Sequence, residues 1–326
     1  MDTLPPELIL LIFDTIPLIT DKRHFLSVTK KYNLSTKQLF LEYEKNYSIK
    51  DFENITKYSV EKFTSELCHD KYFDLIPENY IIPSNDILIK SLSYFNNIPL
   101  LELSKLKGCE MNRVCGYSAL NDQLSVLQWA RANGCDWNEW TCTCAAENGH
   151  LDVLKWAREN GCDWNSNTCT YASYGGHLSI LQWARTNGCD WNKNTCTYAA
   201  SNGHLHVLKW AHTNGCVWDS DTCAYAAKND HLHILQWARE NGCPWDETTC
   251  SNAAAWGHLH ILQWARENGC RWDEWTCINA ARNGHFETLK WARENGCPWD
   301  NRVYQYANRQ GHTELLKWAI ENGCPE

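Results

Sequence analysis

The sequence predicts an all-α protein, built as a solenoid of stacked helix-turn-helix repeats after a small helical N-terminal segment. Two observations predict this fold class. All 18 tryptophans lie at or beyond residue 129, and eight of them recur with a constant period of 27: Trp129, Trp156, Trp183, Trp210, Trp237, Trp264, Trp291 and Trp318. A second tryptophan series, Trp137 to Trp299, and a glycine series, Gly134 to Gly323, follow the same period. Such a period indicates a repeat array in which each unit is one supersecondary element.

Residues 141–165 show how one unit is expected to fold. Thr141 is a good helix N-cap, and we expect a short first helix that begins there and ends near Gly149. A second helix is expected from about Leu151 to Asn160, because its apolar residues recur with helical spacing. No alternating apolar pattern indicates a strand.

One helix pair cannot bury its large apolar side chains alone, whereas stacked copies can. A tryptophan carries roughly 150–250 Å² of buriable surface, which at about 25 cal/mol per Å² contributes at most roughly 4–6 kcal/mol. We therefore expect neighbouring repeats to shield the tryptophans of the second helices, such as Trp156. On this basis Trp210→Ala, in the middle of the array, costs roughly 3–5 kcal/mol.

The residue order within the unit resembles the ankyrin repeat. The positions of the family's Thr-Pro-Leu-His, Ala-Ala, Gly-His and Gly-Ala-Asp elements are occupied by Thr141, Ala145, Ala146, Gly149, His150, Leu151, Gly161 and Asp163. Two features depart from the family: the period is shorter, 27 instead of the usual 33, and Cys142 replaces proline. The missing residues are those of the β-hairpin finger. The resemblance therefore implies an ankyrin-like α-solenoid without long fingers, similar to the shortened repeats of giant DNA viruses.

The repeat pattern also sets the expected domain boundaries. The array is expected to cover residues 86–326, with a degenerate unit at 86–112 followed by regular units of the tryptophan period up to a C-terminal cap. Residues 34–85 are rich in Tyr, Phe, Asn and Lys, and are interpreted as a helical connector that could hold further degenerate repeats.

Residues 1–33 resemble an F-box. Prolines at the start of an apolar helix suit its first turn, and Pro17 ends the segment. Such short amphipathic helices gain stability by placing an apolar face in a partner's groove. The resemblance implies that the partner is the Skp-type adaptor of a cullin ubiquitin ligase, contacted by Leu4, Pro5, Leu8, Ile12, Ile16 and Val28. The alternative is that residues 1–33 form a helical cap on the solenoid.

Composition argues against several classes of function. The net charge is −9, which disfavours broad binding to a nucleic-acid backbone, including RNA recognition by helical repeats. No apolar stretch reaches the ~18 residues of a membrane span, and the N-terminus lacks the features of a secretory signal. We therefore expect a cytoplasmic protein, in the host cytoplasm if the chain is viral, without nucleic-acid or membrane partners.

The 18 cysteines and 13 histidines were considered as metal, disulfide or catalytic groups. No CxxC motif occurs, and the expected compartment is reducing, so the cysteines are interpreted as small buried hydrophobic residues. Three HxH pairs, 204/206, 231/233 and 258/260, are interpreted as structural, with a weak metal site as the alternative. The only singular Cys/His group is Cys68-His69-Asp70, and contiguous residues rarely form a catalytic triad. No enzyme activity and no cofactor are therefore expected.

Residues that vary while the rest of the unit stays constant mark the candidate client-binding surface. In ankyrin-like stacks the first helices line the concave side, and there the candidates are Tyr171, Tyr174, Tyr198, Tyr225, Lys228, Trp256, Arg282, Tyr306 and Arg309. Tyr, Trp and Arg dominate protein-recognition energetics, although some of these tyrosines could instead pack between units. The predicted function is a substrate-recognition adaptor that links a client protein to a ubiquitin ligase. The alternative is a plain scaffold or decoy that binds a host protein.

Overall fold

The computed structural model describes residues 93, 96, 98, 101, 102, 105, 111 and 113–326. The F-box-like segment lies outside these residues, with its candidate adaptor contacts Leu4, Pro5, Leu8, Ile12, Ile16 and Val28. The expected connector and Cys68-His69-Asp70 lie outside them as well. The chain divides into two compact units, residues 1–141 and 142–326.

Residues 113–326 form sixteen α-helices and no strand, which confirms the all-α prediction. The helices alternate as first and second members of a pair and are nine residues long, apart from α7 and α21. Their bounds are α7 Val114–Leu120, α8 Leu124–Ala132, α9 Glu139–Glu147, α10 Leu151–Glu159, α11 Ser166–Tyr174, α12 Leu178–Thr186, α13 Lys193–Ser201, α14 Leu205–Thr213, α15 Ser220–Lys228, α16 Leu232–Glu240, α17 Glu247–Ala255, α18 Leu259–Glu267, α19 Glu274–Arg282, α20 Phe286–Glu294, α21 Asn301–Gln310 and α22 Thr313–Glu321.

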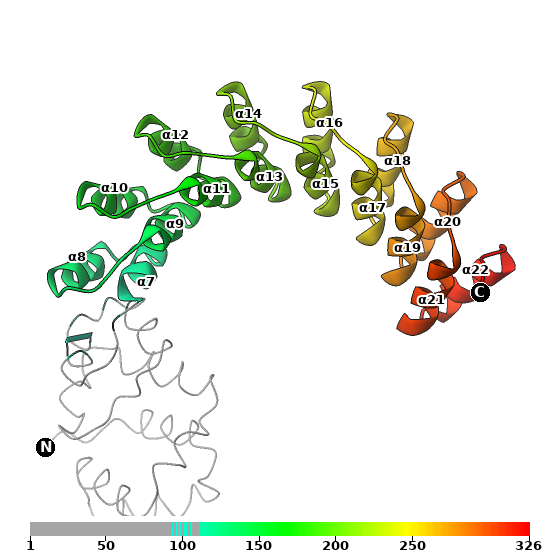
Figure 1. The fold of residues 1–326 in the computed structure, drawn as a ribbon, viewed down its shortest axis with the longest axis horizontal. Coiled ribbons are helices and arrows are strands. Elements are labelled where there is room, and N and C mark those ends of the chain that lie inside the picture. The colour runs from blue at the N-terminus through cyan, green and yellow to red at the C-terminus, as the bar shows by residue number, and fades with distance from the viewer. Residues whose placement is uncertain are drawn as a thin grey trace, which may run out of the picture. The chain divides into compact units, whose positions relative to one another are not determined.

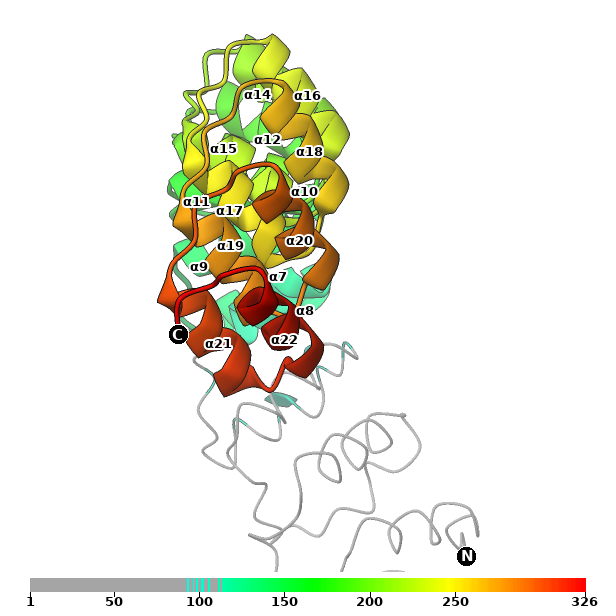
Figure 2. The ribbon, with the colours of Figure 1, turned by 90° about the vertical axis from the view of Figure 1, so that its right-hand side faces the viewer.

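The helices of residues 142–326 form two layers. The odd-numbered first helices α11 to α21 stack side by side, and the even-numbered second helices form the other layer (Figure 2). Within this unit the layers bend into an arc, with the odd-numbered helices on its inner side (Figure 1). The structure therefore has the solenoid architecture that the period predicts, and its extended linkers without β-hairpin fingers agree with what the ankyrin resemblance implies.

The first helices begin earlier than the sequence analysis expected. The N-caps of the first helices α11, α13, α15, α17 and α19 are asparagine or aspartate residues three positions before the periodic threonine, as with Asn165 before Thr168. The side chain of Asn165 accepts a hydrogen bond from the Asn167 backbone N–H at 2.9 Å. The Thr168 hydroxyl is buried and makes no hydrogen bond. The threonine N-cap prediction is therefore wrong, because the linker supplies a short Asx side chain at the position where the chain is still extended.

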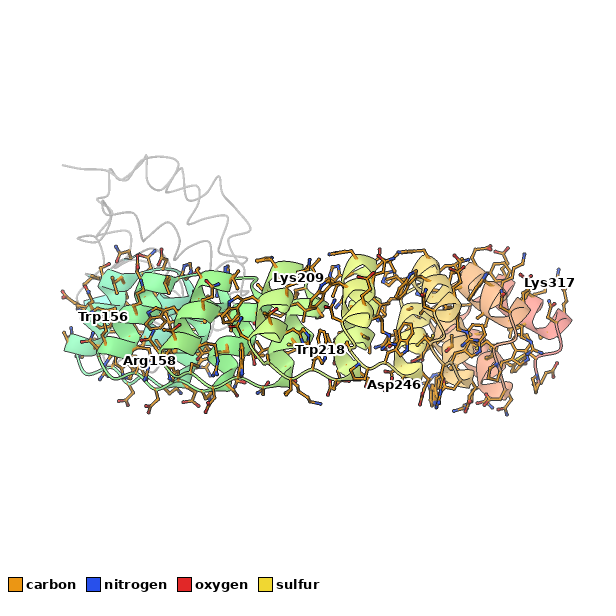
Figure 3. All side chains as sticks on the ribbon, turned by 90° about the horizontal axis from the view of Figure 1, so that it is seen from above. Trp156, Arg158, Lys209, Trp218, Asp246 and Lys317 are labelled. Atoms are coloured by element: carbon orange, nitrogen blue, oxygen red, sulfur yellow. The ribbon has the colours of Figure 1, made fainter. Side chains whose placement is uncertain are left out.

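Two substitutions in one repeat test this assignment of the cap. Asp246, which lies beside the linkers in Figure 3, accepts from the Thr248 N–H at 3.0 Å, so Asp246→Ala is expected to cost about 1 kcal/mol. Thr249→Val removes a buried hydroxyl without a hydrogen bond, and is expected to leave stability unchanged or raise it by up to about 1 kcal/mol. Urea denaturation of both variants gives the comparison. A larger loss for Thr249→Val would restore threonine as the cap.

Glycine ends the helices as predicted at both turns of the unit. Gly149, after a first helix, has φ +86°, and Gly161, after a second helix, has φ +85°. This left-handed conformation is one that glycine adopts without the steric cost of a Cβ atom.

The core of the array consists of small and branched apolar side chains. Most second helices bury a β-branched residue, a leucine and an alanine, such as Val153, Leu154 and Ala157 in α10. Each regular first helix contributes a buried cysteine and small neighbours, such as Cys196 and Ala199 in α13. These small side chains let adjacent first helices approach closely.

The tryptophans of the linkers and of the second helices are partly buried, and they lie at the edge of this core. The linker ring of one repeat meets the second-helix ring of the next edge to face, with centroids 5.6 Å apart for Trp164 and Trp183 and 5.8 Å apart for Trp191 and Trp210. Neighbouring repeats therefore shield most of the surface of these rings. Leucines and alanines fill the fully buried space between the helices.

An arginine covers the linker tryptophan in most repeats. The guanidinium carbon of Arg185 lies 4.3 Å from the centre of the Trp191 ring, and its Nη1 donates to the carbonyl oxygen of Cys189. Arg158, labelled in Figure 3, makes the equivalent contacts with the Trp164 ring and with the carbonyl oxygen of Cys162. In one repeat His212 takes the arginine position and stacks on Trp218 at 3.8 Å. The constant spacing of arginine and tryptophan along the chain is the sequence signal that indicates this contact.

Candidate interaction surface

A histidine precedes most second helices, and its side chain forms a hydrogen bond to the first helix of the preceding repeat. Nε2 of His177 lies 3.0 Å from the carbonyl oxygen of Glu147, and Nε2 of His258 lies 3.1 Å from that of Lys228. The separation is 30 residues in both cases, so the bonds cross from one repeat to the one before it. The structural interpretation of the first histidine in an HxH pair is confirmed for His204 and His258.

Two of these histidines, His204 and His231, make the stability of the array depend on pH. Burial lowers the pKa of His204, and burial together with the neighbouring His233 lowers the pKa of His231. A folded-state pKa below the unfolded one means that the unfolded chain binds more protons. The stabilisation is therefore complete above the unfolded pKa of about 6.5 and is lost as the pH falls through the folded value.

We expect the free energy of unfolding to decrease between pH 7 and pH 5. The double variant His204→Gln plus His231→Gln retains donor groups that do not titrate, so its decrease over this range is expected to be smaller. Urea titrations at five pH values measure both slopes. Equal slopes in the two proteins would assign the pH dependence to other groups.

The carbonyl oxygens that accept these hydrogen bonds belong to one residue of each first helix, near its C-terminal end. Together these residues form a row across the first helices, called here the recognition row. It consists of the residues at positions 147, 174, 201, 228, 255, 282 and 309, which are Glu147, Tyr174, Ser201, Lys228, Ala255, Arg282 and Arg309. The first six end helices α9, α11, α13, α15, α17 and α19. The row has a fixed backbone and varied side chains, as a recognition surface requires.

Three tyrosines gather at the N-terminal part of this row. The rings of Tyr171, Tyr174 and Tyr198 lie with all three centroid separations between 6.0 and 6.2 Å. Tyr171 and Tyr198 are half-buried, and Tyr174 is 43% exposed. Packing between repeats accounts for much of the first two rings, while Tyr174 presents an aromatic surface to solvent.

The central part of the row combines a lysine with two aromatic rings. Nζ of Lys228 lies 5.5 Å from the centre of the Tyr225 ring and 5.4 Å from that of Trp256. Trp256 is 55% exposed, at the C-cap of α17. A cation at this distance from aromatic faces is attracted by their quadrupoles, which orients the lysine.

The C-terminal part of the row carries two arginines. The guanidinium carbon of Arg282 lies 4.8 Å from the centre of the Tyr306 ring, so α19 and α21 are joined by this contact. Arg282 and Arg309 are exposed, and Tyr306 is half-buried. The structure thus brings the nine candidate client-binding residues into three neighbouring groups along α11 to α21.

The sixteen described cysteines are all buried, and none of these sixteen forms a disulfide. Contact with Cys162 and burial raise the pKa of the Cys142 thiol, and burial raises the pKa of Cys144 to about 12. A protonated, buried thiol is a poor nucleophile, which supports the interpretation of these cysteines as small hydrophobic residues.

Residues 113–326 and the other described positions hold neither a cluster of metal ligands nor a membrane-spanning helix. No group of three or more His, Cys, Asp or Glu is placed there to hold a metal ion. None of the helices described there is long and apolar enough to cross a membrane.

The comparison with protein families agrees with the residue pattern and the helix pairs. Residues 142–185 match the family model of ankyrin repeats (many copies). Residues 142–185 are therefore similar to ankyrin repeats, and stacked repeats of this kind present extended concave surfaces that bind other proteins. The crystal structure of the human ASB11 ankyrin repeat domain is 15% identical, with a TM-score of 0.40 over 48% of this chain and 84% of that chain. A search of curated proteins finds no match.

Proposed function

We propose that this chain is a substrate-recognition subunit that holds a client protein on its ankyrin repeats and presents it to a cullin-type ubiquitin ligase. The client binds the inner side of α11 to α21, through the candidate residues Tyr171, Tyr174, Tyr198, Tyr225, Lys228, Trp256, Arg282, Tyr306 and Arg309. The client-binding part of this proposal rests on one observation about the recognition row and its neighbour Trp256. At these positions the residue type differs from repeat to repeat while the helices are constant, and Tyr174, Trp256 and Arg282 are exposed. Large aromatic and arginine side chains supply most binding energy at protein interfaces.

The ligase-recruiting half rests on the F-box-like residues Leu4, Pro5, Leu8, Ile12, Ile16 and Val28. In this proposal the chain performs no chemistry, and it supplies proximity between ligase and client. The apolar residues of this segment dock in a groove of the Skp-type adaptor.

An adaptor pull-down tests this half. Full-length protein is expected to capture a purified Skp-type adaptor, and the double variant Leu8→Ala plus Pro5→Ala is expected to lose at least nine-tenths of the capture. The control is Trp256→Ala, which alters the client surface and is expected to leave adaptor capture unchanged. Equal capture by wild type and double variant, or none by either, would favour the scaffold or decoy function instead.

A further inference from the structure

We propose that Lys228, Arg282 and Arg309, together with Trp256, bind an extended acidic segment of the client protein. This inference deepens the proposed client-binding function and rests on it, because it assigns a chemical class to the part of the client that meets the recognition row.

The first argument is that these three cations have no carboxylate partner. Elsewhere on the first helices, Lys193 pairs with Asp219 at 2.5 Å, and Arg302 pairs with Asp300 at 2.6 Å. Among the described residues, no carboxylate lies within 4.0 Å of Lys228, Arg282 or Arg309. A chain with a net charge of −9 thus carries unpaired positive charge along one line of its inner side. Charge complementarity there favours an acidic partner.

The second argument is that aromatic rings hold two of the cations in place. Lys228 lies near the rings of Tyr225 and Trp256, and Arg282 stacks on Tyr306. Side chains that are already ordered lose less conformational entropy when a ligand binds. The exposed Trp256 ring adds an apolar surface beside the Lys228 charge, suited to an apolar side chain of the client.

The third argument is that the backbone beneath the row is fixed. The carbonyl oxygens of Lys228, Ala255 and Arg282 each accept a hydrogen bond from a histidine of the next repeat, at 3.1, 3.1 and 3.2 Å. The spacing of the cations is therefore set by the repeats and not by mobile loops.

This spacing predicts the length of the acidic segment. Lys228 and Arg309 are three repeats apart, and Arg282 is one repeat from Arg309. Packed helices lie about 8–10 Å apart, while a chain in the polyproline II conformation rises about 3.1 Å per residue and presents every third side chain on the same side. One repeat thus corresponds to about three residues of ligand. An acidic segment of about nine to twelve residues, with carboxylates at multiples of three, spans all three cations.

A binding assay with defined peptides tests this inference. The probe is a fluorescein-labelled peptide of four Glu-Ser-Val triplets, and its neutral counterpart has four Gln-Ser-Val triplets. A labelled twelve-nucleotide single-stranded RNA tests the competing anion. Full-length protein is titrated into each probe and fluorescence anisotropy is recorded. We expect the Glu peptide to bind at least tenfold more tightly than the Gln peptide, and more tightly than the RNA.

Two triple variants with the same change of charge make the assay specific. Lys228→Gln, Arg282→Gln and Arg309→Gln together are expected to weaken binding of the Glu peptide at least tenfold. The matched control neutralises Lys155, Lys290 and Lys317, which lie on second helices, and is expected to stay within twofold of wild type. Circular dichroism and melting temperature verify that both variants fold.

Three results would overturn the inference: no preference for the Glu peptide, equal weakening by both triple variants, or tighter binding of the RNA. The proposed client-binding function is checked separately by capturing client proteins with wild type and with Tyr174→Ala plus Trp256→Ala. If the double variant loses the clients and the Glu peptide does not bind to wild type, the client-binding function stands and the acidic chemistry of the client segment is rejected. Clients captured equally by both proteins would reject the function itself.

Discussion

Replacing Leu208 with alanine is expected to lower the free energy of unfolding by about 3–5 kcal/mol, a large effect for one side chain. Leu208 lies in α14, in the middle of the array, and is completely buried. Repeats on both sides continue the stack, so the surroundings cannot collapse into the space without shifting a neighbouring repeat. The lost transfer energy and the remaining cavity then add. Urea denaturation of full-length protein, followed by far-ultraviolet circular dichroism, measures the change.

Trp210, on the same helix, provides the matched comparison. Most of its surface is removed from water, and its ring meets that of Trp191 with centroids 5.8 Å apart, so most of its apolar area is at stake. At about 25 cal/mol per Å², Trp210→Ala is expected to cost roughly 3–5 kcal/mol, the range that the sequence alone predicts. A loss for Trp210→Ala far below that for Leu208→Ala would show that the second-helix tryptophans contribute little to the core.

The repeat architecture was predictable from the sequence, because a strict period constrains every unit at once. The left-handed turns at Gly149 and Gly161 and the burial of Leu154 follow from that period and from helical spacing. The N-cap was placed wrongly since Thr and Asx residues share the same propensity, and only the extended backbone at Asn165 distinguishes them. The partial exposure of the tryptophans depends on inter-repeat packing, which no single unit encodes.

The candidate interaction surface was predictable in its positions but not in its contacts. Variation at a fixed place in the unit indicated Tyr174, Lys228 and Arg282. The stacking of Arg282 on Tyr306 joins residues of two successive first helices, a pairing that depends on how α19 and α21 are offset. That Lys228 and Arg282 have no carboxylate partner likewise depends on where the carboxylates lie in three dimensions. A count of charges along the chain does not show it.

Replacing Gly257 with alanine is expected to destabilise the array by about 3 kcal/mol. Gly257 has φ +74°, which costs an alanine about 1–2 kcal/mol. A Cβ atom there would also lie 2.6 Å from Nδ1 of His285, the ring whose Nε2 lies 3.1 Å from the carbonyl oxygen of Ala255. Relieving this overlap moves the ring away from its acceptor, and the array then loses an inter-repeat hydrogen bond worth about 1 kcal/mol.

Gly215→Ala separates the two causes, because Gly215 has φ +85° and open space within 4 Å of an added Cβ atom. It is expected to cost only about 1–2 kcal/mol, the backbone part of the effect. In a His285→Ala background the overlap at Gly257 disappears, so Gly257→Ala should then cost no more than Gly215→Ala. This double-mutant cycle, read by urea denaturation, measures the coupling between the turn glycine and the histidine of the next repeat. Equal costs for Gly257→Ala with and without His285 would mean that this histidine does not join the two repeats energetically, and that apolar packing alone holds the recognition row in register.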